Sequence, residues 1–276
     1  MLAAIWQEVR GDKAAMTAFI ILIGILTATF SAGFFIDLGN AMRVDLLLRN
    51  SPPSPGLWLG TDPAGRDILP QLLLGARNSF IIAFSVTLAC GFIGTLLGLI
   101  SGFYGGRIDN IIMRILDFFL MLPTLMIIIA LISTMPHYGL GTFVGVMICF
   151  IWADRARLIR AKTLQQAELG YVEASRTLGT PGLVIMLREV LPNLSSIIVV
   201  NTTLTLATNM GLETGLTFLG FGLPFGTPSL GTLIAYAATP TGMMNRPWQW
   251  LPAAILVFTM MLCIYTLGQV IAKAMD

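Results

Sequence analysis

The sequence predicts an all-α integral membrane protein. Of its 276 residues, 56% are hydrophobic and only 11% are charged, and the mean hydropathy is +0.83. Soluble domains carry about 25% charged residues, so water cannot be the main solvent of this chain. A bilayer core of about 30 Å requires about 20 apolar residues per helix. Six runs approach that length, the fourth being the shortest: 14–35, 80–103, 111–134, 140–152 extended by a few residues, 194–215 and 251–272.

The first run has the features of an uncleaved membrane anchor. It follows Arg10 and Lys13, and Ser31-Ala32-Gly33 could serve as a signal-peptidase site. However, the apolar region of a signal peptide spans only about 7–15 residues, and this run is longer. We therefore expect the first helix to stay in the membrane.

A turn precedes the second run. Thr61 and Asp62 are followed by Pro63 and Gly65, which favour a turn, and Arg66 can pair locally with Asp67. Two interpretations stay open for this segment: a solvated turn, or an element with a functional role.

Small residues line one face of the second run. They recur every three or four residues, which predicts close contact with another helix rather than a conduction path. These residues are Gly91, Gly94, Gly98 and Gly102.

Two acidic residues fall inside apolar runs, where an ionised side chain is costly unless it is paired or hydrated. Asp117 follows Arg114 by three residues, so we expect a pair on the helix surface, with a role in transport as the alternative. Glu213 has no cation nearby in the sequence. We expect it either to line a mouth or to lock helices together.

The segment between the fourth and fifth runs, 154–192, holds four acidic and six basic residues. A helix is predicted over 164–178, and Gly179 suits a left-handed cap at its end. Thr180 can cap a second helix, with Pro181 in its first turn and Pro192 limiting it. We therefore expect a compact helix-turn-helix rather than a flexible connection.

The segment 217–231 alternates glycines with apolar residues. This pattern disfavours both a regular helix and a polar loop, so we expect a re-entrant excursion that packs against protein. A loop that shields helix ends at the interface is the alternative.

The positions of Lys and Arg predict the orientation in the membrane. The positive-inside rule places residues 1–13, the turn 104–110, the loop 154–192 and the tail 273–276 in the cytoplasm. It places 36–79 and 216–250 outside, so that 80–272 forms a five-helix core after the first helix. The basic residues on the cytoplasmic side are Arg10, Lys13, Arg107, Arg114, Arg155, Arg157, Arg160, Lys162, Arg176, Arg188 and Lys273, and those outside are Arg43, Arg49, Arg66, Arg77 and Arg246.

The sequence offers no constellation for catalysis or metal binding. Cys90, Cys149 and Cys263 lie alone in apolar runs, and His137 is the only histidine. None of the three lysines lies in a phosphate-binding loop, so the chain cannot use ATP itself. A net charge of +2 does not indicate nucleic acid as a partner. We expect no catalytic residue, metal or cofactor in this chain.

The cytoplasmic loop resembles the Glu-Ala-Ala loop of ABC importer permeases. Glu173-Ala174-Ser175 is followed after three residues by Gly179, and Leu191-Pro192 stands at the expected distance. Two positions depart from the family pattern: Ser175 replaces the second alanine, and Glu189 replaces an isoleucine for which apolar contacts would be expected.

Two external segments resemble the C-type permeases of the dipeptide, oligopeptide and nickel importers. The first is Leu-Gly-Thr-Asp-Pro-Ala-Gly-Arg-Asp over 59–67, although Pro70-Gln71 replaces the usual Ser-Arg. The second is Thr-Phe-Leu-Gly-Phe-Gly over 217–222, followed by Thr-Pro-Ser-Leu-Gly over 227–231, where Leu230 replaces the usual tryptophan.

The resemblance implies a permease subunit with the type I ABC importer fold, six transmembrane helices and a helix that couples it to an ATPase. It implies a B-type permease, two cytoplasmic ATPases holding ATP and Mg²⁺, and a solute-binding protein as partners, in the cell membrane of a bacterium. The predicted coupling residues are Tyr171, Glu173, Ala174, Ser175, Gly179, Leu191 and Pro192, and the candidates for the external mouth or pathway are Asp62, Arg66, Asp67, Glu213, Phe218 and Gly220.

Alternatives to this function stay open. Asp117 and Glu213 keep an ion-coupled secondary carrier in consideration. A membrane-embedded enzyme is disfavoured because His137 has no partner set. Within the resembling family, peptides, nickel chelates and peptide-like solutes are all candidate substrates.

Overall fold

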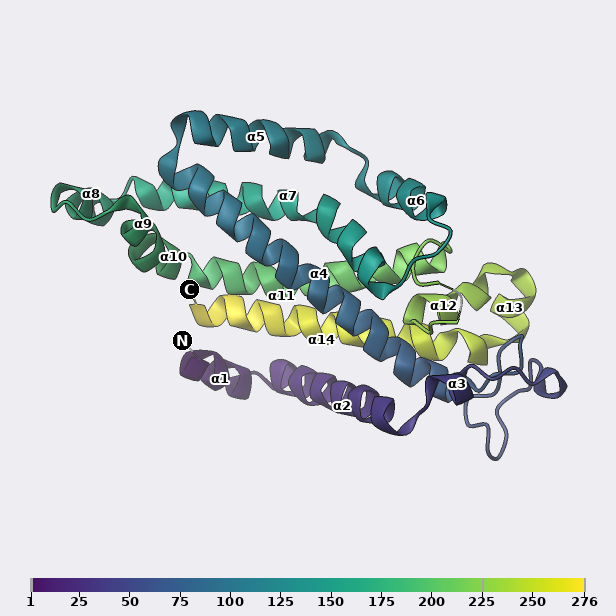
Figure 1. Cartoon of the computed structure of the whole chain (residues 1–276). Helices are drawn as coiled ribbons and strands as arrows, with labels where there is room; N and C mark the ends of the chain where they lie inside the picture. The colour runs from purple at the N-terminus through teal and green to yellow at the C-terminus, as the bar shows by residue number, and fades with distance from the viewer. Residues whose placement is uncertain (1, 225, 276) are drawn as a thin grey trace.

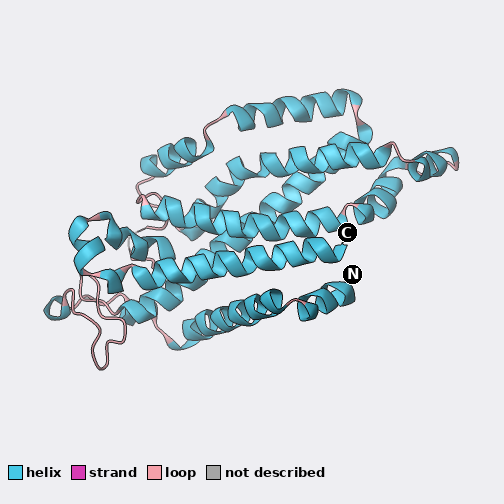
Figure 2. Cartoon of the chain, turned by 180° about the vertical axis from the view of Figure 1, so that it is seen from behind, coloured by secondary structure: helices cyan, strands magenta, loops and turns pink. Residues whose placement is uncertain are grey.

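The structure, a computed structural model, describes residues 2–224 and 226–275, which contain helices and two isolated bridges but no strand. The predicted all-α class is confirmed (Figures 1 and 2). The α-helices are α1 (Leu2–Gly11), α2 (Lys13–Phe35), α3 (Leu38–Ala41), α4 (Ile68–Tyr104), α5 (Gly106–Met121), α6 (Thr124–Thr134), α7 (Leu140–Ala167), α8 (Gly170–Thr177), α9 (Gly182–Ile185), α10 (Leu191–Asn193), α11 (Ser195–Phe218), α12 (Leu230–Ile234), α13 (Pro240–Asn245) and α14 (Leu251–Met275). Short turns of helix are η1 (Leu46–Leu48), the π-helical η2 (Met186–Val190), η3 (Ala235–Ala238) and η4 (Pro247–Gln249).

The long helix α4 is the centre of the bundle. It runs obliquely across α7, α11 and α14 and contacts all three (Figure 1). On one side, Ala83 packs with Met210 and Met260 of α11 and α14. On the other side, Ile82 packs with side chains of α6, α7 and α11. Helix α4 therefore lies between two clusters of the core.

The loops and short helices gather at the two ends of the bundle. Both chain ends and the α8–α10 segment lie at one end, and α3, α12 and α13 lie at the other (Figure 1). Lys273 Nζ and Glu8 Oε1 are 2.6 Å apart, so α1 and the end of α14 are joined. The positions of the basic residues predict the same division of these segments between the two sides of the membrane. Which end faces the cytoplasm stays a prediction.

Three helices, α2, α4 and α14, are long and apolar enough to cross a membrane. Two bent pairs raise this number to five if each pair is one span: α5 with α6, bent by 76°, and 182–193 with α11, bent by 61°. Helix α7 is not among them, since it carries charged residues from Asp154 onward. Six spans therefore stay a prediction.

The helix boundaries differ most from the predicted runs at two places. Helix α4 begins at Ile68, twelve residues before the run 80–103, because the side chain of Asp67 accepts a hydrogen bond from Leu69 N (3.0 Å) and caps it. Helix α7 continues to Ala167, so the first part of the segment 154–192 is helical and part of the bundle. Polar residues within a helix do not end it, which is why hydropathy placed this boundary too early.

The third run is broken in the middle. Helix α5 ends at Met121, and α6 begins after Pro123. Proline removes a backbone hydrogen bond and clashes with the preceding turn, so a sharp bend follows at this position.

The glycine stripe is a helix contact, as predicted. A Cβ atom at Gly94 would lie 2.6 Å from Arg155 Cγ, and one at Gly98 would lie 2.7 Å from Ala156 O. A Cβ at Gly102 would lie 2.7 Å from that of Thr163. The absence of side chains thus allows α4 and α7 to touch along their backbones.

Candidate functional site

A helix-turn-helix projects from the bundle between α7 and α11 (Figure 1). Helix α8 ends at a left-handed Gly179 with φ of +81°. Gly179 N donates to Arg176 O (3.0 Å) and Thr180 N donates to Ser175 O (3.1 Å), the two bonds of a Schellman cap. The predicted turn is confirmed, although the helix before it is shorter than predicted because Glu168 and Leu169 separate α7 from α8.

The predicted cap of the second helix was wrong by one residue. Helix α9 begins at Gly182, and Pro181 O accepts the first bonds, from Val184 N (2.9 Å) and Ile185 N (3.1 Å). The hydroxyl of Thr180 does not cap it. The fixed φ of proline suits the residue that enters the helix as well as one inside its first turn.

The second helix ends close to Pro192, since the segment 182–193 stops one residue later and bends by 61° into α11. Pro192 lies inside the helical segment, and the preceding turn widens into η2, where Leu191 N donates to Met186 O. A proline ring clashes with the carbonyl four residues earlier in a regular α-helix. One extra residue in the turn removes the clash, so the helix continues past Pro192 to Asn193.

The helix-turn-helix has an anchored face and an exposed face. Val172 and Ile185 are fully buried and pack with Phe103 of α4. Glu173 and Ala174 are exposed, and Leu178 beside the turn is 84% exposed. The tip of the projection is therefore exposed, while its base is anchored to the bundle.

The remaining predicted coupling residues support the turn from within. Tyr171 Oη donates to Gln166 Oε1 (2.9 Å) at the end of α7. Ser175 Oγ donates to Glu189, at 2.7 Å from Oε1 and 2.9 Å from Oε2. The expected apolar surroundings of position 189 were therefore wrong, because a hydroxyl faces it. Leu191 is half-buried and Pro192 is exposed.

Arg155 joins α7 to α11 inside the bundle. It is only 7% exposed, and its guanidinium donates to Asn201 Oδ1 (2.5 Å), Thr202 Oγ1 (2.5 Å) and Ile198 O (3.0 Å). The charge pattern placed Arg155 in a loop, and sequence reasoning missed this contact because the partners lie more than 40 residues away. The one signal for this contact in the sequence is the polar pair Asn201-Thr202 inside the fifth run, which can bond to a charged residue on a neighbouring helix.

Two ion pairs hold α5 against α7. Arg160 Nε and Asp109 Oδ1 are 2.5 Å apart, Arg160 Nη2 and Asp109 Oδ2 are 2.6 Å apart, and Ser101 of α4 also donates to this carboxylate. Asp117 pairs with Arg157 rather than with Arg114, so the predicted partner was wrong. Asp117 on α5 thus pairs with Arg157 on the neighbouring helix α7 and not with Arg114 on its own helix.

At the opposite end, the turn around Asp62 is buried rather than solvated. Thr61 and Asp62 are both 0% exposed. Asp62 Oδ1 accepts from the backbone of Ala64 (2.7 Å) and Arg66 (3.0 Å), and Gly65 N donates to Asp62 O (3.0 Å). This closes the predicted turn.

The side-chain contacts of this turn differ from the prediction. Arg66 Nε lies 3.6 Å from Asp62 Oδ2, while Asp67 caps α4, so the predicted Arg66–Asp67 pair was wrong. Asp62 Oδ2 also accepts from Gln71 Nε2 (3.2 Å) and Tyr236 Oη (3.0 Å). Burial and the Asp62 carboxylate raise the pKa of Tyr236, and burial raises that of Asp67. The turn thus fastens α4 to the segment after α12.

The segment 217–231 folds back against protein, as its glycine pattern predicts. Gly220, with φ of +88°, ends α11. Asn78 Nδ2 of α4 donates to Pro228 O (2.9 Å), and Leu230 N donates to Ser79 Oγ (3.2 Å). A Cβ at Gly231 would lie 2.6 Å from Thr214 O of α11. The segment is therefore wedged between α4 and α11, with Phe218 and Gly220 exposed at its edge.

Glu213 lies beneath this wedge. It is 0% exposed and accepts hydrogen bonds from the hydroxyls of Thr217 (3.0 Å) and Thr214 (3.3 Å), with Ser79 also in contact. No salt bridge includes it within residues 2–224 and 226–275. Both threonines belong to α11, the helix of Glu213 itself, so whether Glu213 lines a mouth or locks helices together stays a prediction.

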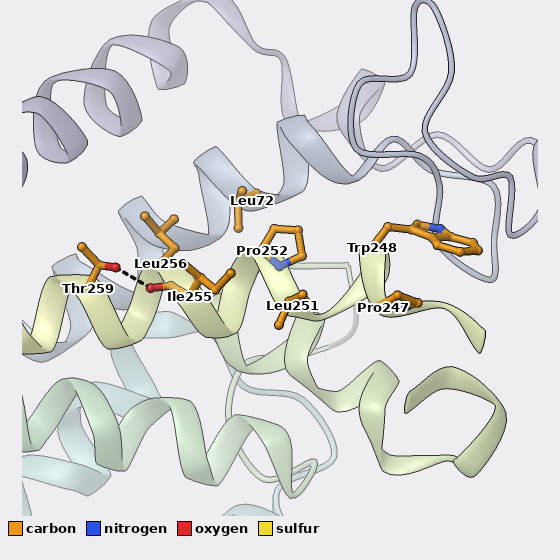
Figure 3. A pocket seen from close by; sticks show the side chains of 8 residues that line it. All are labelled: Leu72, Pro247, Trp248, Leu251, Pro252, Ile255, Leu256 and Thr259. Atoms are coloured by element: carbon orange, nitrogen blue, oxygen red, sulfur yellow. Dashed lines mark hydrogen bonds between the residues drawn. The ribbon is translucent and has the colours of Figure 1, made fainter. Parts of the chain in front are cut away.

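Two hollows lie near this end of the bundle. An apolar groove of about 420 Å³ offers no group that would hold the charged ends of a peptide; the Thr259 hydroxyl beside it donates to Ile255 O at 2.7 Å (Figure 3). A more polar hollow of about 530 Å³ is lined by Arg77, Asn78, Asp37 and Thr227. The groove residues are Leu72, Pro247, Trp248, Leu251, Pro252, Ile255, Leu256 and Thr259.

Comparison with known proteins agrees with this architecture. The profile of the family "Binding-protein-dependent transport system inner membrane component" matches residues 94–276, which include the helix-turn-helix and the 217–231 wedge. The oligopeptide transport system permease protein OppC of Lactococcus lactis subsp. cremoris (strain SK11) is 42% identical over 277 residues, covering 100% of this chain and 94% of that protein.

More distant relatives cover nearly as much. OppC of Bacillus subtilis (strain 168) is 35% identical over 262 residues, covering 93% of this chain and 85% of the relative. The dipeptide transport system permease protein DppC of the same strain is 32% identical over 271 residues, covering 98% and 84%. The family that the sequence motifs resemble is thereby confirmed. This chain belongs to the binding-protein-dependent transport system inner membrane components.

Proposed function

We propose that this chain is the membrane-spanning permease subunit of an ATP-driven ABC importer of oligopeptides. The observation that carries the proposal is the rigid, exposed helix-turn-helix between α7 and α11. A movement imposed on its tip is transmitted to two long helices at once. The oligopeptide and dipeptide systems named for the relatives support peptides as the substrate class.

The surface of α11 supports a pathway shared with a second permease. Thr208 and Gly215 are exposed on one face of the helix, and Thr205 on the same face is half-buried, while Asn201 bonds to Arg155 of α7. In membrane proteins, small residues and threonines are enriched where helices pack against other helices rather than against lipid. We therefore assign this face to the pathway, with the related B-type permease opposite.

The other partners follow from what this chain lacks and from what it exposes. Because its sequence contains no phosphate-binding loop, two cytoplasmic ATPases with bound ATP and Mg²⁺ supply the energy, and they contact the α8 turn. A solute-binding protein delivers the peptide at the opposite end. There, the burial of Asp62 and Glu213, together with the half-buried positions of Arg66 and Asp67, supports a structural role for these residues.

Reconstitution of the assembled complex in proteoliposomes tests this proposal through ATP-dependent uptake of a labelled oligopeptide. Gly179→Val should lower uptake by about tenfold or more, because a β-branched residue in the left-handed region costs on the order of 1–3 kcal/mol and reshapes the turn. Glu173→Lys should lower it by reversing a charge on the exposed face, while the binding protein keeps its affinity for the peptide.

Gly179→Asn is the matched control, because asparagine tolerates the left-handed conformation and should keep uptake near that of the unmodified complex. Equal uptake by the Val and Asn variants would contradict the coupling assignment. Uptake driven by an ion gradient in the absence of the ATPases would favour a secondary carrier instead.

A further inference from the structure

The two positions at which the coupling loop departs from the pattern it resembles touch each other. Ser175 Oγ lies 2.7 and 2.9 Å from the two carboxylate oxygens of Glu189, fourteen residues further along the chain. Both side chains are half-buried. No salt bridge includes Glu189 in the described ranges, so the Ser175 hydroxyl is the side-chain donor that this carboxylate has there.

Helix α8 depends on contacts with its neighbours for its direction. A helix of eight residues is not stable by itself in water. Its other contacts are the buried Val172, the hydrogen bond from Tyr171 Oη to Gln166 Oε1 (2.9 Å) and the Arg176 guanidinium, which lies 5.1 Å from the centre of the Phe103 ring. At the turn, a Cβ on Gly179 would meet no atom within 4 Å, so neighbouring groups do not restrain the turn sterically.

The π-helical turn determines where Glu189 points. Each residue of an α-helix turns the chain by about 100°. The extra residue in η2 therefore rotates the side chains of η2 and α9 about the helix axis, compared with a regular helix that leads into α11. Pro192 accounts for this extra residue, because a regular turn would clash with its ring. Asn193 Nδ2 donates to the Glu189 carbonyl at 2.9 Å within the same segment. The orientation of Glu189 toward α8 is thus built into the sequence.

We propose that Ser175 and Glu189 are a positioning pair that holds the coupling helix α8 at a fixed angle to the helix leading into α11. The proposal rests on the proposed function, since the angle matters where α8 contacts an ATPase. Alanine and isoleucine, the residues of the family pattern, would bring the same two elements together through an apolar contact. This chain uses a charge-assisted hydrogen bond in its place.

The test compares four variants of the full complex in proteoliposomes: Ser175→Ala, Glu189→Ala, Ser175→Ala with Glu189→Ile, and Thr177→Ala. Two quantities are measured, the hydrogen-exchange rates of the α8 amides and the number of peptides imported per ATP hydrolysed. Thr177→Ala is the matched control, because it removes a hydroxyl that bonds only to Glu173 O within α8 (2.9 Å).

Ser175→Ala should raise the α8 exchange rates by about tenfold, the effect of losing one hydrogen bond to a charged group, and should lower import per ATP. Glu189→Ala should act alike, and the Ala/Ile pair should restore both quantities. Unchanged exchange in Ser175→Ala, or faster exchange with unchanged import per ATP, would overturn the positioning role. An unmodified complex that imports no peptide would overturn the proposed function instead, while the exchange rates still decide whether the pair restrains α8.

Discussion

Gly91 and Gly98 occupy the same face of α4 but have different surroundings. A Cβ at Gly98 would lie 2.7 Å from Ala156 O, 2.8 Å from Ile159 Cβ and 2.9 Å from Arg160 N. At Gly91, the only atom within 4 Å is Arg155 Nη2, at 3.9 Å. A flexible side chain can move away from a methyl group, whereas the backbone of α7 cannot.

Gly98→Ala should therefore lower the free energy of unfolding by about 1–3 kcal/mol, the usual cost of overfilling a tight contact. Gly91→Ala should change it by less than about 0.5 kcal/mol. Thermal unfolding of the purified complex in detergent measures both. If the two variants melt at the same temperature, α4 and α7 are not in backbone contact at Gly98.

At the scale of elements, α5 is attached to the bundle by its two ion pairs and by Leu116, which is fully buried. The pairs differ in surroundings. The Asp109 side chain is 13% exposed and accepts from Nε and Nη2 of Arg160 and from Ser101. The Asp117 side chain is 46% exposed. Solvent screens the second pair more strongly.

Asp109→Asn should loosen α5, because it replaces a two-point ionic contact by a neutral one. The hydrogen-exchange rates of the amides in the first turns of α5 should then rise several-fold, because the free energy of local opening falls by on the order of 1–2 kcal/mol. Asp117→Asn is the control and should change exchange little, since exposed pairs contribute about 0–1 kcal/mol. Equal effects at the two positions would show that burial does not distinguish the pairs.

Part of this arrangement could be predicted from the sequence. The apolar helices and the turn at Gly179 depend on residues that are close together in the sequence, so both could be predicted from it. Arg155, Asp109 and Ser175 find their partners 14 to 51 residues away. Such contacts depend on how helices cross, which hydropathy does not encode, and the partner of Asp117 was mistaken for the same reason. Arg66 instead lies near Asp62, only four residues away, because the turn brings the two together.

At the scale of the whole molecule, the two ends of the bundle differ in charge, and this difference predicts its orientation. Eleven basic residues fall on the side of the α8 turn and five on the other. Basic segments are retained in the cytoplasm during insertion. The α8 turn should therefore face the cytoplasm, and the loop before α4 should face outward.

Cysteine labelling measures this orientation. In a chain whose three cysteines are replaced, Thr180→Cys should react with a membrane-impermeant maleimide only in inverted vesicles. Ser54→Cys, in the loop before α4, should react only in intact cells. Labelling of both positions from the same side would contradict the predicted topology.

The contact between Glu8 and Lys273 has a practical consequence for anyone who handles this protein. Because α1 and the end of α14 are joined on the same end of the bundle as the α8 turn, an affinity tag or fluorescent protein fused near either of them would occupy the space where the ATPases are expected to dock. The exposed residues 52–56, at the opposite end, offer an insertion point that keeps this space clear.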